Sequence, residues 1–282
     1  TSWSLAEAYR QMNQTGKAAE FYEAAAKTTN SEPDRFKSEF WLAVTTGKEE
    51  EQLKITGSSQ SKLDQYRRKR QQADSKMAAT WARLSPEQRQ KIYTALRPQF
   101  EDTVNSPTFI KTPAKIILAE WTKSLNTSVS ATTGSDNSDW DKNFSATSSS
   151  VFLISNLAKR FGQMGMAKER RQALNLLRQL KPKDFVDDKE ARALWSAELL
   201  DLAEEYRTSN ELLEAGKLYK LIGEESNDWE GRAETLYKAG LLLFRSGRRQ
   251  EALDAFQKAA EDVNNLKYSE LAKERLSQLQ TQ

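Results

Sequence analysis

The sequence of 282 residues contains neither cysteine nor histidine. These two absences remove thiol nucleophiles, imidazole general bases, the triads built on either, and nearly every zinc site. Only Asp, Glu, Lys, Tyr, Ser and Thr remain for catalysis, which leaves a carboxylate-dependent hydrolase or an oxygen-ligand metal site as the enzymatic alternatives. We expect a protein with no catalytic residues, no metal ion and no cofactor.

Long apolar runs and a targeting signal are also missing. No apolar run reaches the ~18 residues that a membrane span needs. The first residues, Thr1-Ser2-Trp3, have neither an initiator Met nor a signal-peptide pattern. We therefore expect no membrane span, and we expect natural sequence to precede residue 1.

Glycine and proline are scarce, at 11 and 6 residues, while charged residues make up 29%. Apolar residues recur three and four positions apart almost everywhere, a pattern typical of helix and not of strand. The sequence Ser85-Pro86-Glu87-Gln88 predicts a helix that begins at Pro86, with a capping box around Ser85. The predicted helices span 2–14, 18–29, 33–46, 59–83, 86–104, 112–125, 151–164, 167–180, 188–207, 211–223, 229–246, 249–262 and 267–279.

The helices are divided into sections by one polar stretch, residues 126–150, which is rich in Ser, Thr, Asn and Asp. We expect a long loop there, because it offers few apolar residues to bury. The predicted organisation is N-terminal helical hairpins over 1–58, long helices without a repeat over 59–125, the loop, and a C-terminal array over 151–282.

Two copies of one residue order occupy the last third of the chain. The second copy has Ala239-Gly240 and Leu243, a turn at Gly247, and then Ala252, Phe256 and Ala259. Antiparallel helices approach closely only where small side chains such as Gly240 and Ala252 stand. The first copy has the same order: Leu199, Leu202-Ala203, Tyr206, Asn210, Ala215, Tyr219 and Ile222.

This order of residues resembles the tetratricopeptide repeat. Ala215 and Ala252 are 252 − 215 = 37 residues apart, against about 34 in the family. Weaker copies open the chain, with the turn at Gly16, and cover 151–183, where the alignment needs about three extra residues after Gly165. The resemblance implies an all-α solenoid of antiparallel hairpins, closed by a capping helix over 267–279.

The resemblance also implies a function. In this family the first helices of successive repeats line a groove that receives a peptide or helix of another protein, so we expect a non-enzymatic scaffold or adaptor. Absent cysteines and a general likeness to envelope repeat proteins favour the bacterial periplasm or envelope over the cytoplasm. An equal alternative is that the capping helix or another part of this chain covers the apolar stripe of the groove, Tyr237, Leu241 and Phe244. The positions that correspond to the groove are Leu200, Glu204, Arg207, Thr208, Tyr237, Leu241, Phe244 and Arg245.

Charge is uneven along the chain. From Lys62 to Arg97 there are ten basic and three acidic residues, and the densest run is Tyr66-Arg67-Arg68-Lys69-Arg70. The alternative function is therefore binding of nucleic acid or another polyanion by residues 62–97, although no RNA-reading motif accompanies the run. From Asp187 to Glu214 there are nine acidic and three basic residues, which would favour a basic partner segment.

Overall fold

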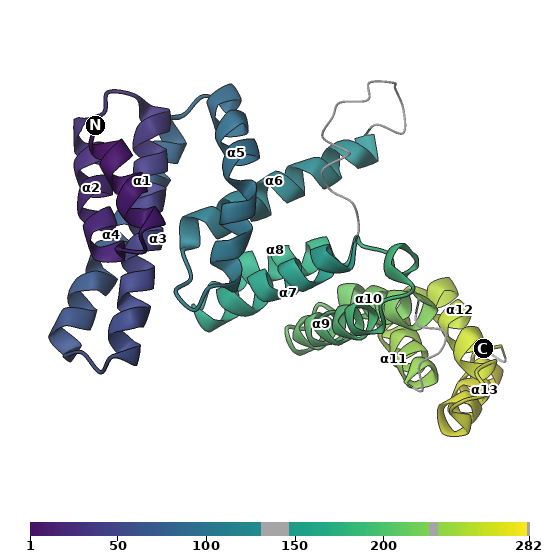
Figure 1. Cartoon of the computed structure of the whole chain (residues 1–282). Helices are drawn as coiled ribbons and strands as arrows, with labels where there is room; N and C mark the ends of the chain where they lie inside the picture. The colour runs from purple at the N-terminus through teal and green to yellow at the C-terminus, as the bar shows by residue number, and fades with distance from the viewer. Residues whose placement is uncertain (131–146, 226–230, 281–282) are drawn as a thin grey trace. The chain divides into compact units, whose positions relative to one another are not determined.

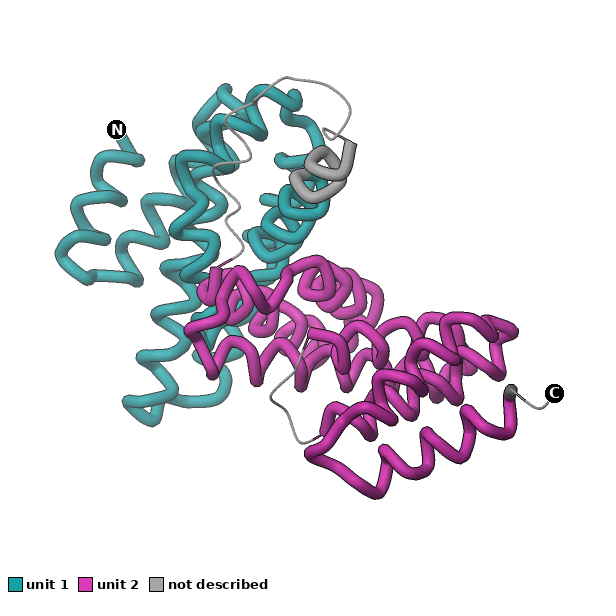
Figure 2. Tube along the Cα trace, turned by 90° about the vertical axis from the view of Figure 1, so that its right-hand side faces the viewer, with its two compact units in different colours: residues 1–136 teal, residues 137–282 magenta. Residues whose placement is uncertain are grey.

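The computed structural model describes residues 1–130, 147–225 and 231–280. Within these residues the chain is all-α, with thirteen α-helices, one short 3-10 helix and no strand. The all-helical prediction is confirmed. The chain forms two compact units, residues 1–136 and 137–282 (Figure 2).

The described part of unit 1 contains six helices, and the first four pack one on the next along the chain (Figure 1). Helices α5 and α6 pack on each other and against α3 and α4. The core is aromatic: the buried rings of Phe36 and Phe40 lie 6.3 and 5.1 Å from that of Phe100. The six helices are α1 (Ser2–Gln11), α2 (Thr15–Thr28), α3 (Glu32–Ile55), α4 (Gln60–Arg83), α5 (Pro86–Asn105) and α6 (Lys111–Ser130).

The described part of unit 2 contains seven helices, which pack mostly on their sequence neighbours. The short 3-10 helix Pro182–Phe185 joins the first hairpin to the second. Trp195 is buried, and its indole N–H donates to the carbonyl of Leu177 at 2.9 Å. The seven helices are α7 (Ser148–Gln163), α8 (Ala167–Leu177), α9 (Lys189–Thr208), α10 (Leu212–Glu225), α11 (Arg232–Arg245), α12 (Arg249–Ala260) and α13 (Leu266–Gln280).

Among the described residues, five hairpins share one turn geometry. In each, a single residue with positive φ follows the first helix, and the next N–H donates to the carbonyl five residues before it, as from Arg248 to Leu243 at 2.9 Å. This left-handed residue ends a helix at low cost when it is Gly or Asn. The five turn residues are Asn13, Gly57, Gly165, Asn210 and Gly247.

Two positions counted from these turns hold residues of similar burial in most of the five hairpins. Seven residues before the turn, every residue is buried: Ala6, Glu50, Ala158, Ala203 and Gly240. Nine residues after the turn stands a large side chain, buried in all but Tyr66: Tyr22, Tyr66, Leu174, Tyr219 and Phe256.

The structure corrects two turn alignments. We expected the first turn at Gly16, but Gly16 lies inside α2 and the turn residue is Asn13, with φ of 57°. Asn enters this region because its short polar side chain bonds locally. We also expected extra residues after Gly165, and there are none. Arg170 simply stands where the later hairpins have Ala215 and Ala252.

Most predicted helix boundaries agree with the structure, and the capping box at Ser85 and Gln88 is present. The largest difference is α3, which runs to Ile55 and not to residue 46. Its last two turns bury Glu50, which forms ion pairs with Lys54 at 3.0 Å and Arg70 at 3.1 Å. Glu50 is thus a buried carboxylate at a position where apolar spacing would call for an apolar residue. For this reason the apolar pattern does not predict the last two turns of α3.

The expected loop 126–150 lies partly outside the described residues. Helix α6 continues to Ser130 and α7 begins at Ser148. The finer division at residues 58 and 125 stays a prediction. No described helix is long and apolar enough to cross a membrane.

Close helix contacts in unit 2 depend on glycine. A Cβ on Gly240 would lie 2.5 Å from the ring of Phe256, and one on Gly223 would lie 2.5 Å from Cγ of Leu236. A Cβ on Gly16 would lie 3.7 Å from Glu49 and Tyr66, which is ordinary contact. Gly223 and Gly240 are therefore required by packing, whereas Gly16 is not.

The same substitution should have opposite effects at these sites. We expect Gly223→Ala and Gly240→Ala each to lower the free energy of unfolding by about 1–2 kcal/mol, because overpacking outweighs the helix propensity of Ala. Gly16→Ala should leave it unchanged or raise it by up to ~1 kcal/mol. Urea unfolding followed by circular dichroism measures this. Equal effects at the three positions would contradict the packing explanation.

A second prediction concerns buried Glu39, which accepts a hydrogen bond from the Thr80 hydroxyl at 2.7 Å. Burial raises the pKa of Glu39 above the ordinary 4.5, against the opposing effect of Thr80. The folded state thus binds the carboxyl proton of Glu39 more tightly than the unfolded state does. The free energy of unfolding therefore falls as pH rises from 4.5 through the pKa of the folded state. Glu39→Gln should melt at a higher temperature than wild type at pH 7, and at the same temperature near pH 4. A difference in melting temperature between Glu39→Gln and wild type that is the same at both pH values would contradict this.

Candidate functional site

The eight expected groove residues lie on α9 and α11, the first helices of two consecutive hairpins. They occupy the same four positions, which are ten, six, three and two residues before Asn210 and Gly247. Three of them, Leu200, Tyr237 and Leu241, are half-buried, and the other five are exposed. We call these eight residues the first-helix surface of unit 2.

On α9 this surface is polar and internally paired. Glu204 accepts hydrogen bonds from Arg207, with Nε at 2.8 Å, and from the Tyr219 hydroxyl at 3.0 Å. The Arg207 bonds, with help from Tyr219, lower the pKa of Glu204 to about 2. Burial and the bond to Glu204 raise the pKa of Tyr219 to about 12. Thr208 donates to the backbone carbonyls of Glu204 and Glu205 at 3.0 Å.

The same three groups meet in unit 1. Arg10 Nη2 lies 2.7 Å from Glu7 Oε2, and the Tyr22 hydroxyl also donates to Glu7. Burial alone would raise the pKa of Glu7, but the bonds to Arg10 and Tyr22 outweigh it and lower the pKa. Glu7, Arg10 and Tyr22 stand six and three residues before their turn and nine after it, as Glu204, Arg207 and Tyr219 do. We call each set an E-R-Y cluster.

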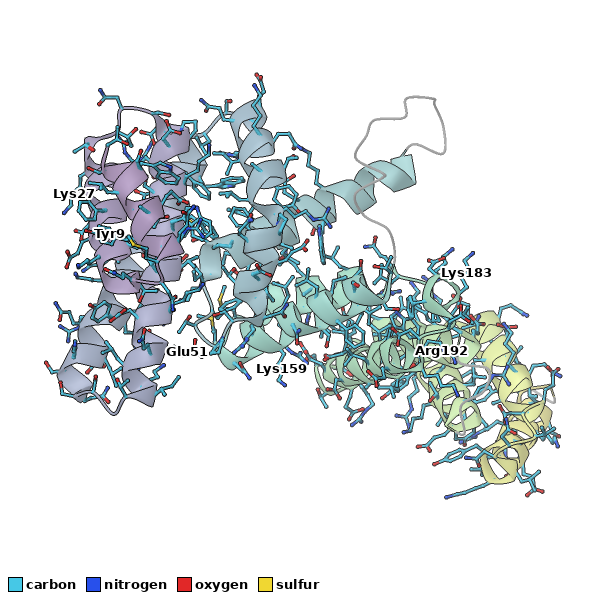
Figure 3. All side chains as sticks on the ribbon, viewed as in Figure 1. Tyr9, Lys27, Glu51, Lys159, Lys183 and Arg192 are labelled. Atoms are coloured by element: carbon cyan, nitrogen blue, oxygen red, sulfur yellow. The ribbon has the colours of Figure 1, made fainter. Side chains whose placement is uncertain are left out.

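The E-R-Y cluster was not predicted as a unit, although its spacing is visible in the sequence: Glu, then Arg three residues later, then Tyr fifteen residues after the Glu. Glu204 and Arg207 were expected to contact a partner. In the structure Arg207 donates to Glu204, and Glu204 also accepts a hydrogen bond from Tyr219. At the position of Glu204, the hairpins of α3 and α7 have Glu51 and Lys159 (labelled in Figure 3).

On α11 the equivalent residues are apolar. Leu241, Phe244 and Phe256 stand at the three positions of the E-R-Y cluster. Phe256 is buried against Gly240, whereas Phe244 is 40% exposed. The ring of Tyr237 lies 5.7 Å from that of Phe256 and 5.9 Å from that of Tyr268 on α13. Helix α13 thus contacts Tyr237, at one end of the apolar stripe Tyr237, Leu241 and Phe244, while Phe244 keeps an exposed surface.

Helices α9 and α11 are close enough for their charges to interact. Lys238 on α11 contributes to the lowered pKa of Glu204. It also forms an ion pair with Glu234 at 2.7 Å. The first-helix surface therefore combines a neutralised charge cluster with the apolar residues Leu241 and Phe244.

Some of the acidic residues around α9 form ion pairs with α8. Glu205 pairs with Arg170 and, at 3.0 Å, with Arg171 on α8. Arg171 also pairs with Glu211 at 3.0 Å. Four of the nine acidic residues of 187–214 thus form ion pairs within unit 2: Glu204, Glu205, Glu211 and Glu214.

Ion pairs also connect the second helices of the hairpins. Arg178 on α8 pairs with Glu214 on α10 at 3.2 Å. Lys220 on α10 pairs with Asp254 on α12, and Lys258 on α12 pairs with Glu224, both at 2.6 Å. Partly exposed pairs of this kind contribute little to stability one by one, but they occupy the charges on this side of unit 2.

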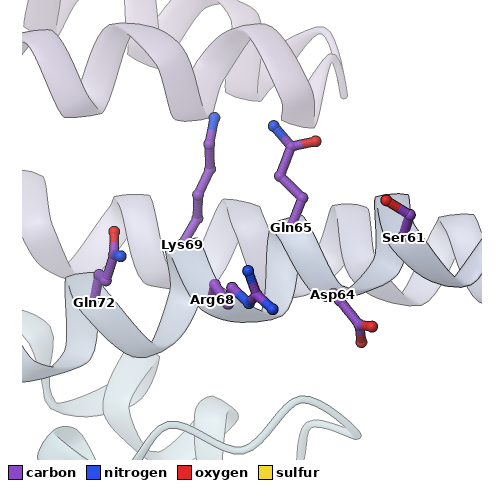
Figure 4. A pocket seen from close by; sticks show the side chains of 6 residues that line it. All are labelled: Ser61, Asp64, Gln65, Arg68, Lys69 and Gln72. Atoms are coloured by element: carbon purple, nitrogen blue, oxygen red, sulfur yellow. The ribbon is translucent and has the colours of Figure 1, made fainter.

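Among the described residues, no group of three or more acidic side chains is placed to hold a metal ion. A shallow depression on α4 is lined by Ser61, Asp64, Gln65, Arg68, Lys69 and Gln72 (Figure 4). Its one carboxylate, Asp64, is bonded to Arg67 at 3.1 Å and Gln60 at 2.9 Å. It therefore does not present the paired carboxylates of a hydrolase.

No protein-family model matches this sequence, and no curated protein matches it.

The E-R-Y clusters allow a test by nuclear magnetic resonance. The carboxyl group of Glu204 should titrate near pH 2, and Arg207→Gln should raise its pKa toward the ordinary 4.5 because the largest stabilising hydrogen bonds are removed. Glu7 serves as the internal control, since its own cluster is intact in that variant. Arg10→Gln should affect Glu7 and leave Glu204 unchanged. A Glu204 pKa that is insensitive to Arg207→Gln would show that the cluster does not form.

Proposed function

We propose that the chain is a tetratricopeptide-like helical array that holds another protein and does not catalyse a reaction. The five hairpins with one turn geometry support this proposal, because the residue seven positions before the turn is buried in all five and the residue nine positions after it is buried in four. A hairpin buries only part of its apolar surface, so such hairpins stack on their neighbours.

We propose the first-helix surface of unit 2 as the partner-binding site. The observation that carries the proposal is the exposed ring of Phe244, which stands where two other hairpins place a charged Arg. Exposed aromatic residues beside matched polar groups are the usual anchors of protein interfaces. The partner segment would lie across α11, with Leu241 and Phe244 as apolar contacts and Glu204, Arg207, Thr208 and Arg245 at the polar edge.

The proposed location is the bacterial envelope. It rests on the absence of cysteine and on the likeness to envelope repeat proteins, since a chain without thiols folds equally well in an oxidising compartment. Fractionation of the native cell into cytoplasm and envelope tests this proposal separately from partner binding.

A single substitution tests the binding site. Phe244→Glu places a charge at the centre of the proposed contact and should reduce capture of the partner from native cell extract by at least about tenfold, as loss of an interface anchor does. Tyr237 is a poor choice for substitution because it packs on Phe256 and Tyr268. Quantitative mass spectrometry of the captured proteins is the measurement.

The matched control is Val263→Glu. Val263 is 81% exposed in the connection between α12 and α13, and the substitution makes the same change from apolar to acidic outside the first-helix surface. Val263→Glu should capture the same proteins as wild type. If Phe244→Glu also captures them unchanged, the proposed site is wrong.

A further inference from the structure

In the basic region 62–97 on unit 1, some basic residues form ion pairs (matched charges) and others do not (unmatched charges). Five of its ten basic residues form ion pairs: Arg67, Arg70, Arg83, Lys91 and Arg97. A sixth, Arg89, donates to the carbonyls of Trp81 and Ala82 at the end of α4. The other four have no carboxylate within ion-pair distance among the described residues: Lys62, Arg68, Lys69 and Lys76.

These four residues all lie on α4, which has 24 residues. Lys62, Lys69 and Lys76 are seven residues apart, so they follow one side of the helix at intervals of about 10.5 Å. Arg68 adds a fourth cation next to Lys69. The result is a row of cations about 21 Å long on a rigid element.

The depression on α4 is lined by two of these cations, Arg68 and Lys69 (Figure 4). Around Arg68 and Lys69 it offers the hydroxyl of Ser61 and the amides of Gln65 and Gln72. Hydroxyl, amide, ammonium and guanidinium groups are the side-chain donors that contact phosphate oxygens in protein complexes with nucleic acid. None of the six lining residues is aliphatic or aromatic.

Two carboxylates lie near the row: Asp64 of the depression, which pairs with Arg67 at 3.1 Å, and Glu23 on α2. The pKa of Glu23 is lowered mainly by its bond to Lys27 and further by the charges of Lys69 and Lys76. Lys27 pairs with Glu23 at 2.7 Å and so neutralises it locally. The four unmatched cations of α4 therefore keep a net positive surface.

We propose that this surface binds the phosphate backbone of double-helical nucleic acid without reading its sequence. A straight row of cations matches a rigid line of phosphates, and such contacts are independent of base sequence. Single strands are bound through aromatic stacking, and membranes through apolar side chains that enter the lipid. The depression has neither, and lysine-rich surfaces are untypical of protein interfaces.

The experiment measures binding of the full chain to a 24-base-pair DNA duplex at several salt concentrations by fluorescence anisotropy. The test variant combines Lys62→Gln, Lys69→Gln and Lys76→Gln. Removing one lysine–phosphate ion pair lowers the slope of log affinity against log salt by about 0.9. We expect the slope to fall by about 2.7 for the three lysines, and affinity at 50 mM salt to fall on the order of tenfold for each of them.

The matched control combines Lys168→Gln, Lys181→Gln and Lys183→Gln, which removes the same charge from exposed positions of unit 2 (Lys183 is labelled in Figure 3). It should keep the wild-type slope. Circular dichroism confirms that both variants are folded.

Three results would overturn the proposal. They are no duplex binding by wild type at 50 mM salt, an equal reduction of affinity in the test and control variants, or tighter binding to single strands or to phosphatidylserine vesicles than to the duplex. Each of these is independent of the Phe244 site on unit 2.

Discussion

The close approach of two helices just before a tight turn is the constraint on which these hairpins depend. Seven residues before each turn, the second helix passes so near that four hairpins have only Ala or Gly there, and at Gly240 even a methyl group would meet the Phe256 ring. Interiors of this density tolerate no extra atom. The left-handed turn residue then reverses the chain within a few residues, which fixes the register between the two helices.

Glu50 is the exception at that position, and it shows how the constraint can be met differently. Its carboxylate is buried in place of a small residue, and Arg70 and Lys54 neutralise it. A buried charge of this kind persists only when it is paired, because an unpaired one would be strongly destabilising. As a consequence Arg70, which belongs to the densest basic run, is held by a buried carboxylate inside unit 1.

Most of the helix boundaries could be predicted from the sequence, because apolar periodicity and caps such as Ser85 are local features. The sequence could not show which charges are matched, since pairs such as Arg171 with Glu205 or Arg70 with Glu50 join residues 20 or more positions apart. Glu204 and Arg207 are only three residues apart, so their pairing is a local feature, whereas the hydrogen bond from Tyr219 to Glu204 depends on how the hairpin folds.

The turn at Asn13 was not predicted, because nearby Gly16 belongs to the residue type that more often forms such turns. The apolar residues Leu241 and Phe244 could be found because their helical spacing is visible without the fold. Local sequence patterns therefore predict helices and their apolar faces. They do not predict the contacts that a side chain makes with a segment distant in the sequence.

Helix α13 has a consequence for the integrity of the array. Its Tyr268 packs on Tyr237, Ala272 is buried, and the carbonyl of Leu279 accepts a hydrogen bond from Arg249 at 2.6 Å. A chain cut after residue 265 would leave the aromatic side of α11 and α12 open, with the same kind of surface that each hairpin offers to the next. Exposed apolar surface of this kind favours association between molecules, so we expect a chain without α13 to self-associate.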